Sequence, residues 1–311
     1  VILMLFSSIF NYYMGTELER LYYDDRKQKI NLIFSIIINL AVLVFFKYYG
    51  FLLNTIGGIT GIHIPHPELS LPIGLSFYTF RNLSYLFDIY LSKVSAQRNF
   101  LTFAVYSTMF PYTSAGPIVR YTDIETQLKQ RTINISKFGI GAELFVKGLA
   151  KKVLLADNLS VLYSSICGHP QMSVFTSWLG ILAYTMQLYF DFSGYSDMAI
   201  GLGKMLGFDF NKNFDYPYIS TSVSEFWRRW HISLGSWFRD YIYIPLGGNR
   251  VSTLKHIRNI LVVWALTGLW HGASWNFVLW GVYYGLFLLL EKFVLQKYLK
   301  KIPSWLCTVY T

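Results

Sequence analysis

Two histidines in strongly apolar surroundings are the residues of this sequence best suited to chemistry. His271 lies near the centre of residues 259–290, a stretch of 32 residues without Asp, Glu, Lys or Arg. An ionisable side chain within a membrane is costly and is usually retained for function. Desolvation favours a neutral imidazole, which is the form that accepts a proton. The sequence therefore indicates a proton acceptor at His271; the alternative is a buried histidine that only hydrogen-bonds a carbonyl group.

The second histidine, His231, ends the aromatic and basic run Phe226-Trp-Arg-Arg-Trp-His231. The same position suits a histidine that merely packs against its tryptophan neighbours at a membrane interface. The other four histidines are interpreted as loop or surface residues: His63, His66, His169 and His256. We predict no metal site, because no carboxylate or cysteine cluster accompanies the two histidines that share a loop.

Charged side chains beside the apolar runs are the remaining candidates. Asp191 and Asp197 follow an apolar run directly and can cap helices, bind a partner or orient a histidine. Four arginines can bind the phosphates of a nucleotide-bearing donor, or can instead mark cytoplasmic loops and contact lipid head groups: Arg228, Arg229, Arg239 and Arg250. The sequence contains no Gly-x-Ser-x-Gly elbow, P-loop or dinucleotide-binding fingerprint.

The composition is typical of a polytopic membrane protein. Hydrophobic residues make up 53% of the 311 residues, charged residues 14% and aromatic residues 19%, and the mean hydropathy is +0.36. These values exclude a disordered, collagen-like or disulfide-stapled chain, and the two cysteines, Cys167 and Cys307, are too few for a disulfide framework. We attribute the net charge of +10 to cytoplasmic loops and expect no nucleic-acid partner.

Runs without charged residues give the expected membrane segments. These are residues 1–16, 30–46, 69–91, 99–119, 158–190 and 259–290, of which the third contains Arg81 and Asp88. Residues 17–29 carry four basic side chains and residues 54–70 carry none, which places the first loop in the cytoplasm and the second outside. Lys47 is expected to snorkel from the end of its run. With no signal peptide at its start, the chain is interpreted as an internal piece of a longer protein.

Three segments are expected to be broken or amphipathic. Residues 99–119 contain Pro111 and Pro117 and are predicted to be broken or re-entrant, and residues 158–190 must turn at Gly168-His169-Pro170. Residues 225–242 are predicted to form one amphipathic helix that lies in the cytoplasmic interface or lines a funnel there, with a tryptophan-rich face opposite the arginines.

The segment that carries His271 is predicted to be a hairpin. As one helix, residues 259–290 would be about 48 Å long, so we expect a turn near Gly272-Ala273-Ser274 and two arms of about 14 to 16 residues each. Such a hairpin holds His271 deep in the membrane. Gly268 and Gly272 would allow close backbone approach, and Trp270 and Trp275 would wall the site.

Several motifs, in the same order along nearly the whole chain, resemble the membrane-bound O-acyltransferases, and most closely the bacterial branch typified by the membrane subunit of alginate O-acetyltransferase. The resembling motifs are Leu71-Pro-Ile-Gly-Leu-Ser-Phe-Tyr78, Ala115-Gly-Pro117, Lys151-Lys152, the block 189–203 around Asp191, Asn213-Phe214, Pro217-Tyr218, the block 225–234 around His231, Arg239-Asp-Tyr241, Leu246-Gly-Gly-Asn-Arg250 and Gly268-Leu-Trp-His-Gly272. Teichoic acid D-alanyl-transfer proteins resemble the chain more distantly, because the motif that ends at Arg250 is the acetyltransferase-like version.

The resemblance implies roles for particular residues. His271 matches the family's catalytic histidine, and His231 matches its second characteristic histidine. It also implies a helical bundle with a thinned centre, entered by funnels from both faces, with helices missing at both ends of this chain. In Phe110-Pro-Tyr-Thr113 the family has a histidine at the third position, where this chain has Tyr112.

Together these observations predict an all-α polytopic transmembrane bundle with short, broken and re-entrant helices, forming one membrane domain over residues 1–311 in the bacterial cytoplasmic membrane. The expected activity is acyl transfer, acetyl in the first place, from cytoplasmic acetyl-CoA to an extracytoplasmic polysaccharide hydroxyl, directly or through an acyl-accepting partner protein. No bound cofactor is expected. Besides the two histidines, the candidate substrate-binding or donor-binding residues are Arg228, Arg229, Arg239, Asp191, Asp197 and Trp270.

Three alternatives stay open. The first is D-alanyl transfer to a cell-wall polymer. The second is a proton-coupled transporter or flippase with His271 as its coupling site, although no second copy of the Trp270-His271-Gly272 hairpin marks a related half. The third is a scaffold that has lost its activity, which both histidines disfavour.

Overall fold

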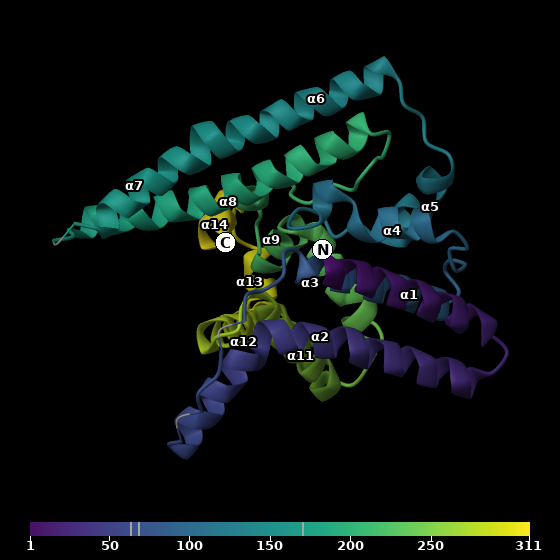
Figure 1. Cartoon of the computed structure of the whole chain (residues 1–311). Coiled ribbons are helices and arrows are strands. Elements are labelled where there is room, and N and C mark those ends of the chain that lie inside the picture. Colours follow the sequence, from purple (N-terminus) through teal and green to yellow (C-terminus); the bar gives the residue numbers. More distant parts are fainter. Residues whose placement is uncertain (63, 68, 170) are drawn as a thin grey trace. The chain divides into compact units, whose positions relative to one another are not determined.

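A computed structural model describes residues 1–62, 64–67, 69–169 and 171–311 of the chain (Figure 1). All regular structure in these ranges is helical, as predicted. The α-helices are α1 (Ile2–Arg20), α2 (Asp25–Thr60), α3 (Leu75–Tyr90), α4 (Phe100–Thr108), α5 (Tyr121–Lys129), α6 (Ile135–Ala150), α7 (Asp157–Cys167), α8 (Val174–Met205), α9 (Val223–Arg229), α10 (Ile232–Phe238), α11 (Thr253–His271), α12 (Trp275–Leu290), α13 (Gln296–Leu299) and α14 (Ser304–Tyr310). The 3₁₀ turns are η1 (Phe110–Tyr112) and η3 (Pro217–Ile219), and the π-helical turns are η2 (Lys151–Ala156), η4 (Arg239–Tyr243) and η5 (Glu291–Leu295).

The described residues form two compact units. Unit 1 comprises Val1–Met109, Arg120–Thr122 and Asp215–Thr311, and unit 2 comprises Phe110–Val119 and Asp123–Phe214. Two segments of unit 1 are long and apolar enough to cross a membrane, Asp25–Thr60 and Trp275–Leu299. A single membrane domain with more spans stays a prediction.

Helices α1 and α2 are polar inside and apolar outside. Their contact buries Asn11 and Asn39, whose side-chain amides exchange two hydrogen bonds of 3.0 and 2.8 Å. Apolar side chains of the same helices are exposed: Leu5, Phe6, Ile9, Ile30, Ile33, Phe34, Ile37 and Leu40. Helices that pack in lipid use small and polar residues at their contacts and direct apolar ones outward. This pair therefore has the pattern of lipid-facing helices.

Helix α2 is longer than the charge pattern predicts. It continues 14 residues beyond the expected end at Phe46, to Thr60, so the first part of the expected outer loop is helical. Lys47 consequently lies within the helix and does not snorkel from an end. The prediction failed because a charged residue was taken as a helix boundary, whereas here the neighbouring helices supply Lys47 with acceptors.

Helices α11 and α12 form the predicted hairpin. The turn falls at residues 272–274, and Gly268 approaches Gly281 so closely that a Cβ atom on Gly268 would lie 2.3 Å from the carbonyl oxygen of Phe277. The arms are longer than expected. Helix α11 has 19 residues because its first turns include Lys255 and Arg258, and the apolar helix of the second arm continues to Leu299.

The predicted single helix over residues 225–242 is wrong. Helix α9 ends at Arg229, whose carbonyl group accepts the backbone N–H of Asp215 at 2.9 Å. Trp230 is extended and His231 is left-handed, with φ +45° and ψ 54°, before α10 begins. A left-handed residue cannot continue a right-handed helix. The apolar periodicity thus belongs to two short helices that meet at His231.

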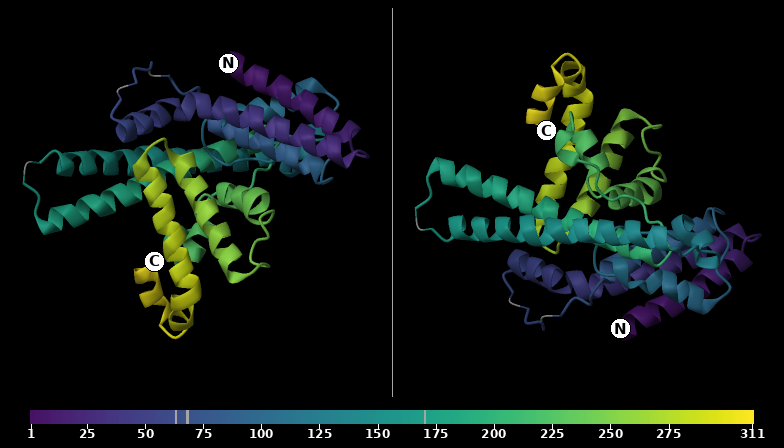
Figure 2. Two further views of the ribbon diagram at one scale, coloured as in Figure 1. Left: turned by 90° about the horizontal axis from the view of Figure 1, so that it is seen from below. Right: turned by 90° about the horizontal axis from the view of Figure 1, so that it is seen from above.

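Unit 2 is built around a long antiparallel hairpin, in which α6, η2 and α7 run beside α8 (Figure 2). Glycines bring the backbones together, since a Cβ atom on Gly148 would lie 2.5 Å from the carbonyl oxygen of Gly194. The expected turn is confirmed between Cys167 and Val174, although Pro170 lies outside the described residues. The expected break in residues 99–119 is also confirmed, because α4 ends at Thr108 and the chain then makes only the turn η1 before residue 121.

Candidate active site

Both candidate histidines line the same cavity. It has a volume of about 290 Å³ and lies among α9, α10 and α11 of unit 1. Its walls are mainly aromatic and aliphatic, with two arginines, two histidines, a serine and a threonine as the polar residues. The lining residues are Trp227, Arg228, Trp230, His231, Ile232, Leu234, Gly235, Ser236, Phe238, Arg239, Val263, Trp264, Thr267 and His271. We call this space the histidine cavity.

His271 is the last residue of α11 and lines the histidine cavity. Its ring contacts the indoles of Trp270 and Trp280 edge to face, with centroid distances of 5.0 and 4.8 Å. The residue is exposed in the described chain, so an approaching molecule can reach its imidazole. Its depth in a membrane stays a prediction.

His231 occupies the break between α9 and α10 and is only 2% exposed. Its ring lies 5.8 Å from that of Trp270, in an edge-to-face arrangement. One indole therefore contacts both imidazoles, and the three rings form one aromatic wall, of which the two histidines line the histidine cavity. Among the predicted binding residues, Trp270 is the one that the structure brings against both histidines.

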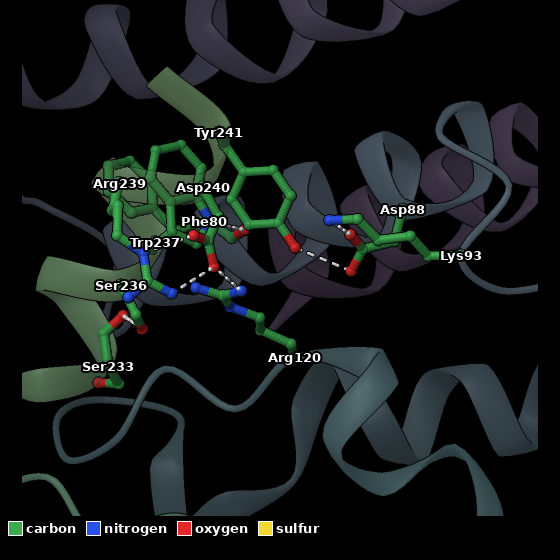
Figure 3. A network of polar contacts seen from close by, with 10 residues as sticks. All are labelled: Phe80, Asp88, Lys93, Arg120, Ser233, Ser236, Trp237, Arg239, Asp240 and Tyr241. Atoms are coloured by element: carbon green, nitrogen blue, oxygen red, sulfur yellow. Dashed lines mark hydrogen bonds and ion pairs between the residues drawn. The ribbon is translucent and has the colours of Figure 1, made fainter. Parts of the chain in front are cut away.

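Trp237 of α10 packs against α3. Its ring stacks on Phe80 with a centroid distance of 4.1 Å, and its Nε1 donates to the Phe80 carbonyl oxygen at 2.9 Å (Figure 3). Phe80 in turn contacts Trp270, with centroids 6.2 Å apart. Aromatic pairs with a hydrogen bond at one end hold a fixed geometry. The wall beside the histidines is thus anchored to a second helix.

Arg120, Asp240 and Arg239 form an ion-pair network (Figure 3). Arg120 donates to Asp240 at 2.7 Å, and Asp240 also accepts a 2.7 Å bond from Nε of Arg239. The buried carboxylate of Asp88 accepts the hydroxyl of Tyr241 at 2.8 Å. Because Arg239 lines the histidine cavity, Asp240 limits the orientations that this guanidinium can adopt there.

The three predicted arginines have different surroundings. Arg228 is exposed and lines the histidine cavity. Arg229 instead donates to Glu225 at 2.8 and 3.0 Å and to the carbonyl group of Asp215, which makes it a structural residue. This guanidinium and the N–H of Thr221 lower the pKa of Glu225 to about 2. The prediction of a phosphate-binding role therefore persists for Arg228 and Arg239, whereas Arg229 already has carboxylate partners.

The capping role considered for Asp191 and Asp197 is wrong. Both lie within the uninterrupted helix α8, where no N–H groups need a cap. Asp191 pairs with Lys152 at 2.8 Å, and Asp197 pairs with Lys151 at 2.6 Å. These ion pairs join α8 to η2 within unit 2. The structure brings neither aspartate to a histidine within that unit.

Two further predictions need correction. His256 is buried in α11, where its Nε2 lies 3.0 Å from the hydroxyl of Tyr243, so it is no surface residue. Trp275, which was expected to wall His271, packs on Phe51, whereas the rings that contact the His271 imidazole are those of Trp270, Phe277 and Trp280. Of the residues interpreted as loop or surface histidines, His63 lies outside the described residues.

Two larger cavities of unit 1 flank the site. One, of about 840 Å³, shares Trp227, Arg228 and two other residues with the histidine cavity and is also lined by Lys292 and Lys300; we call it the basic cavity. The other, of about 890 Å³, is lined by Lys47, His66 and residues 273–275, and we call it the loop cavity. Since residues 273–275 follow His271 directly, the loop cavity begins beside the site.

Three polar residues near the site were missed from the sequence. Lys47 and Tyr48 of α2 donate to carbonyl groups at the end of α11, and Glu291 of η5 accepts from the start of α9. A lysine within an apolar run was an available signal for the first of these. Nothing in the sequence distinguished Tyr48 from the other tyrosines, of which the chain has 24 in total.

Comparison with known proteins relates the chain to acyltransferases. The model of the membrane-bound O-acyltransferase family matches residues 1–301. A probable alginate O-acetylase of Pseudomonas aeruginosa is 44% identical over 296 residues, which cover 93% of this chain and 57% of that protein. A peptidoglycan O-acetyltransferase of Helicobacter pylori is 34% identical, over 98% of this chain and 64% of that protein. A teichoic acid D-alanyltransferase of Bacillus subtilis is 29% identical, over 78% of this chain and 64% of that protein. The chain thus spans little more than half the length of the Pseudomonas relative.

Proposed function

The chain belongs to the membrane-bound O-acyltransferase family, and from that premise we propose that it transfers an acetyl group from a cytoplasmic donor to a hydroxyl group of an extracytoplasmic polysaccharide, directly or through a partner protein. The observation that carries the proposal is that His231 and His271 line one cavity, although they are 40 positions apart in the sequence. Relatives named as O-acetylases share more identity with the chain than those named as D-alanyltransferases, which favours acetyl.

In the proposed reaction His271 acts as the general base. Its neutral imidazole takes the proton from the acceptor hydroxyl while that oxygen attacks the thioester carbonyl carbon; the carbon–sulfur bond breaks, and the departing thiolate receives the proton. In the other order, the imidazole nitrogen attacks the thioester carbon and the thiolate leaves with the imidazole proton; the acetyl group then passes to the hydroxyl oxygen, whose proton returns to the imidazole. General-base catalysis supplies about 10²–10⁴-fold. His231 would orient a substrate or relay a proton through the wall that it shares with Trp270.

The donor is proposed to be acetyl-CoA, entering through the basic cavity. Arg228, Lys292 and Lys300 line that space, and cationic side chains of this kind bind phosphates. By the positive-inside rule, the charged ends of the hairpin favour the cytoplasmic face for the basic cavity. Arg228 lines both the basic cavity and the histidine cavity, which supports a continuous path to the histidines.

The acceptor is proposed to enter through the loop cavity. Gly58, Ile59 and His66 line it, and they come from the segment without basic residues that is expected outside the membrane. From Asn259 to His271, α11 rises about 18 Å, a little over half of a hydrocarbon core of about 30 Å. A polytopic bundle in the bacterial cytoplasmic membrane would then allow donor and acceptor to meet at His271 from opposite faces.

The test is His271→Ala in a strain whose surface polymer depends on this protein. We expect loss of O-acetyl groups from the polymer, measured by mass spectrometry, with unchanged protein level and membrane insertion. His169→Ala, an exposed histidine of unit 2, is the matched control and should retain acetylation. Persistent acetylation in the His271 variant refutes the assignment. Failure of polymer export would instead favour a transporter, and a D-alanyl mass on the wild-type polymer would favour D-alanyl transfer.

A further inference from the structure

Lys47 is a charged residue in the interior of an otherwise apolar helix. Between Ile30 and Thr60, α2 has no other charged side chain. The Nζ of Lys47 donates to the carbonyl oxygen of Trp270 and lies 3.5 Å from the hydroxyl of Ser76. It also lies 5.7 Å from the ring centroid of Trp270. An ionisable residue in an apolar helix is usually retained for function. The carbonyl group that accepts from Lys47 belongs to Trp270, the residue next to His271.

The following residue, Tyr48, makes an equivalent contact. Its hydroxyl donates to the carbonyl oxygen of Leu269 at 2.5 Å. Two successive residues of α2 therefore bind two successive carbonyl groups of α11, just before His271. The last four carbonyl groups of a helix have no donor within the helix. The backbone N–H of Gly272 donates to the carbonyl group of Gly268, at 3.4 Å. The donors for the next two carbonyl groups, those of Leu269 and Trp270, come from α2.

The position of the cation adds to the effect of the hydrogen bonds. A helix C-terminus carries a partial negative charge, which a nearby ammonium group stabilises. Beyond His271 the chain leaves the helix at once, because Gly272 is fully extended with φ −171°. No later turn of α11 exists to hold the histidine. The orientation of its imidazole thus depends on the turn that Lys47 and Tyr48 bind.

We propose that Lys47 and Tyr48 are positioning residues, which fix the last turn of α11 and thereby hold the His271 imidazole in its reactive orientation. This inference rests on the proposed function of His271. It extends the site to α2, whose residues match none of the motifs that carry the family resemblance. Displacement of a catalytic group by about 1 Å can cost on the order of 10²-fold in rate.

The test compares purified full-length Lys47→Met, Lys47→Arg and Tyr48→Phe in detergent or vesicles. Tyr49→Phe is the matched control, since this neighbour packs on Phe45 and His66 rather than on α11. We expect kcat to fall roughly 10- to 100-fold in Lys47→Met and Tyr48→Phe, with the KM for acetyl-CoA within twofold of wild type. Lys47→Arg should recover most of the rate because it keeps donors and charge. In a His271→Ala background Lys47→Met should cause no further loss.

A second readout does not depend on acyl transfer. The rate at which diethyl pyrocarbonate modifies His271, followed by mass spectrometry, should change at least twofold in Lys47→Met and Tyr48→Phe, while the rate at His169 stays constant. If these rates change but even the wild type transfers no acetyl group, the proposed function fails and the positioning role stands. An active wild type with unchanged kcat in both variants, or a raised KM in place of a lowered kcat, overturns the proposal. If Lys47→Met does not fold, Tyr48→Phe, which removes one oxygen atom, decides the question.

Discussion

The carboxylate of Glu291 accepts a hydrogen bond of 2.6 Å from the backbone N–H of Val223. Glu291 follows the last residue of α12, and Val223 is the first residue of α9. The same carboxylate accepts the N–H of Ser224 at 3.0 Å. One buried side chain therefore joins the hairpin that carries His271 to the helix that leads to His231.

We expect Glu291→Ala to destabilise the protein by about 1.5–3 kcal/mol, because the buried N–H of Val223 and the partly buried N–H of Ser224 lose a charged acceptor. Glu291→Gln keeps one oxygen acceptor and should cost less. Glu143→Ala is the matched control; its carboxylate is 63% exposed and makes only a surface ion pair with Lys147. Unfolding in SDS titrations from detergent micelles provides the measurement. Equal losses in the Glu291 and Glu143 variants would contradict this role.

Substitutions at His231 can separate the effect of its left-handed backbone on stability from the effect of its imidazole on acetyl transfer. Its φ of +45° lies in the left-handed region, which asparagine tolerates well and a β-branched residue does not. We expect His231→Asn to fold like wild type but to lose roughly tenfold or more of the acetyl transfer. His231→Val should in addition lose about 1–2 kcal/mol of stability. Full activity in a folded His231→Asn would show that the imidazole only packs.

The hairpin of α11 and α12 could be predicted because its cause is local. An uncharged run too long for one crossing, with glycine and serine at its centre, has few alternatives to a turn. The helical class follows in the same way from apolar runs and composition. These signals require no knowledge of which segments meet in space.

The break at His231 could not be predicted by the same reasoning. Periodicity records which positions are apolar, and two short helices joined by a left-handed residue keep much of that pattern. Asp191 and Asp197 illustrate a related problem, because aspartate is common both at helix ends and in ion pairs. The donors from Lys47 and Tyr48 to α11 depend on residues more than 200 positions away. Local sequence carries no information about such contacts.

The carboxylate of Glu225 is expected to stabilise the folded protein at neutral pH and to lose this effect in acid. Its pKa is lowered from 4.5 to about 2 by the N–H of Thr221 and the guanidinium of Arg229. Between these values the unfolded chain binds a proton at this site and the folded chain does not, so the contribution is complete above pH 4.5 and is lost as the pH falls toward 2. We expect Glu225→Gln to flatten the decline of the unfolding free energy in this window. Glu125→Gln, which removes a carboxylate paired with Lys129, is the control for the loss of one acidic side chain.

Gly268 is predicted to tolerate a methyl group poorly, as is Gly281 opposite it on α12. A Cβ atom there would lie 2.3 Å from the carbonyl oxygen of Phe277 and 3.2 Å from Cα of Gly281, both backbone atoms that cannot rotate away. Gly268→Ala must therefore separate α11 from α12, which should cost about 1–3 kcal/mol and displace His271, three residues further along the helix.

Gly139→Ala in α6 is the matched control for this substitution. A Cβ atom on Gly139 meets nothing within 4 Å, and alanine in a helix interior is favoured over glycine by about 0.8–1 kcal/mol. The two variants should thus shift the unfolding free energy in opposite directions, and only Gly268→Ala should reduce acetyl transfer. A Gly268→Ala protein with wild-type stability and activity would mean that the two helices do not approach as closely as the structure places them.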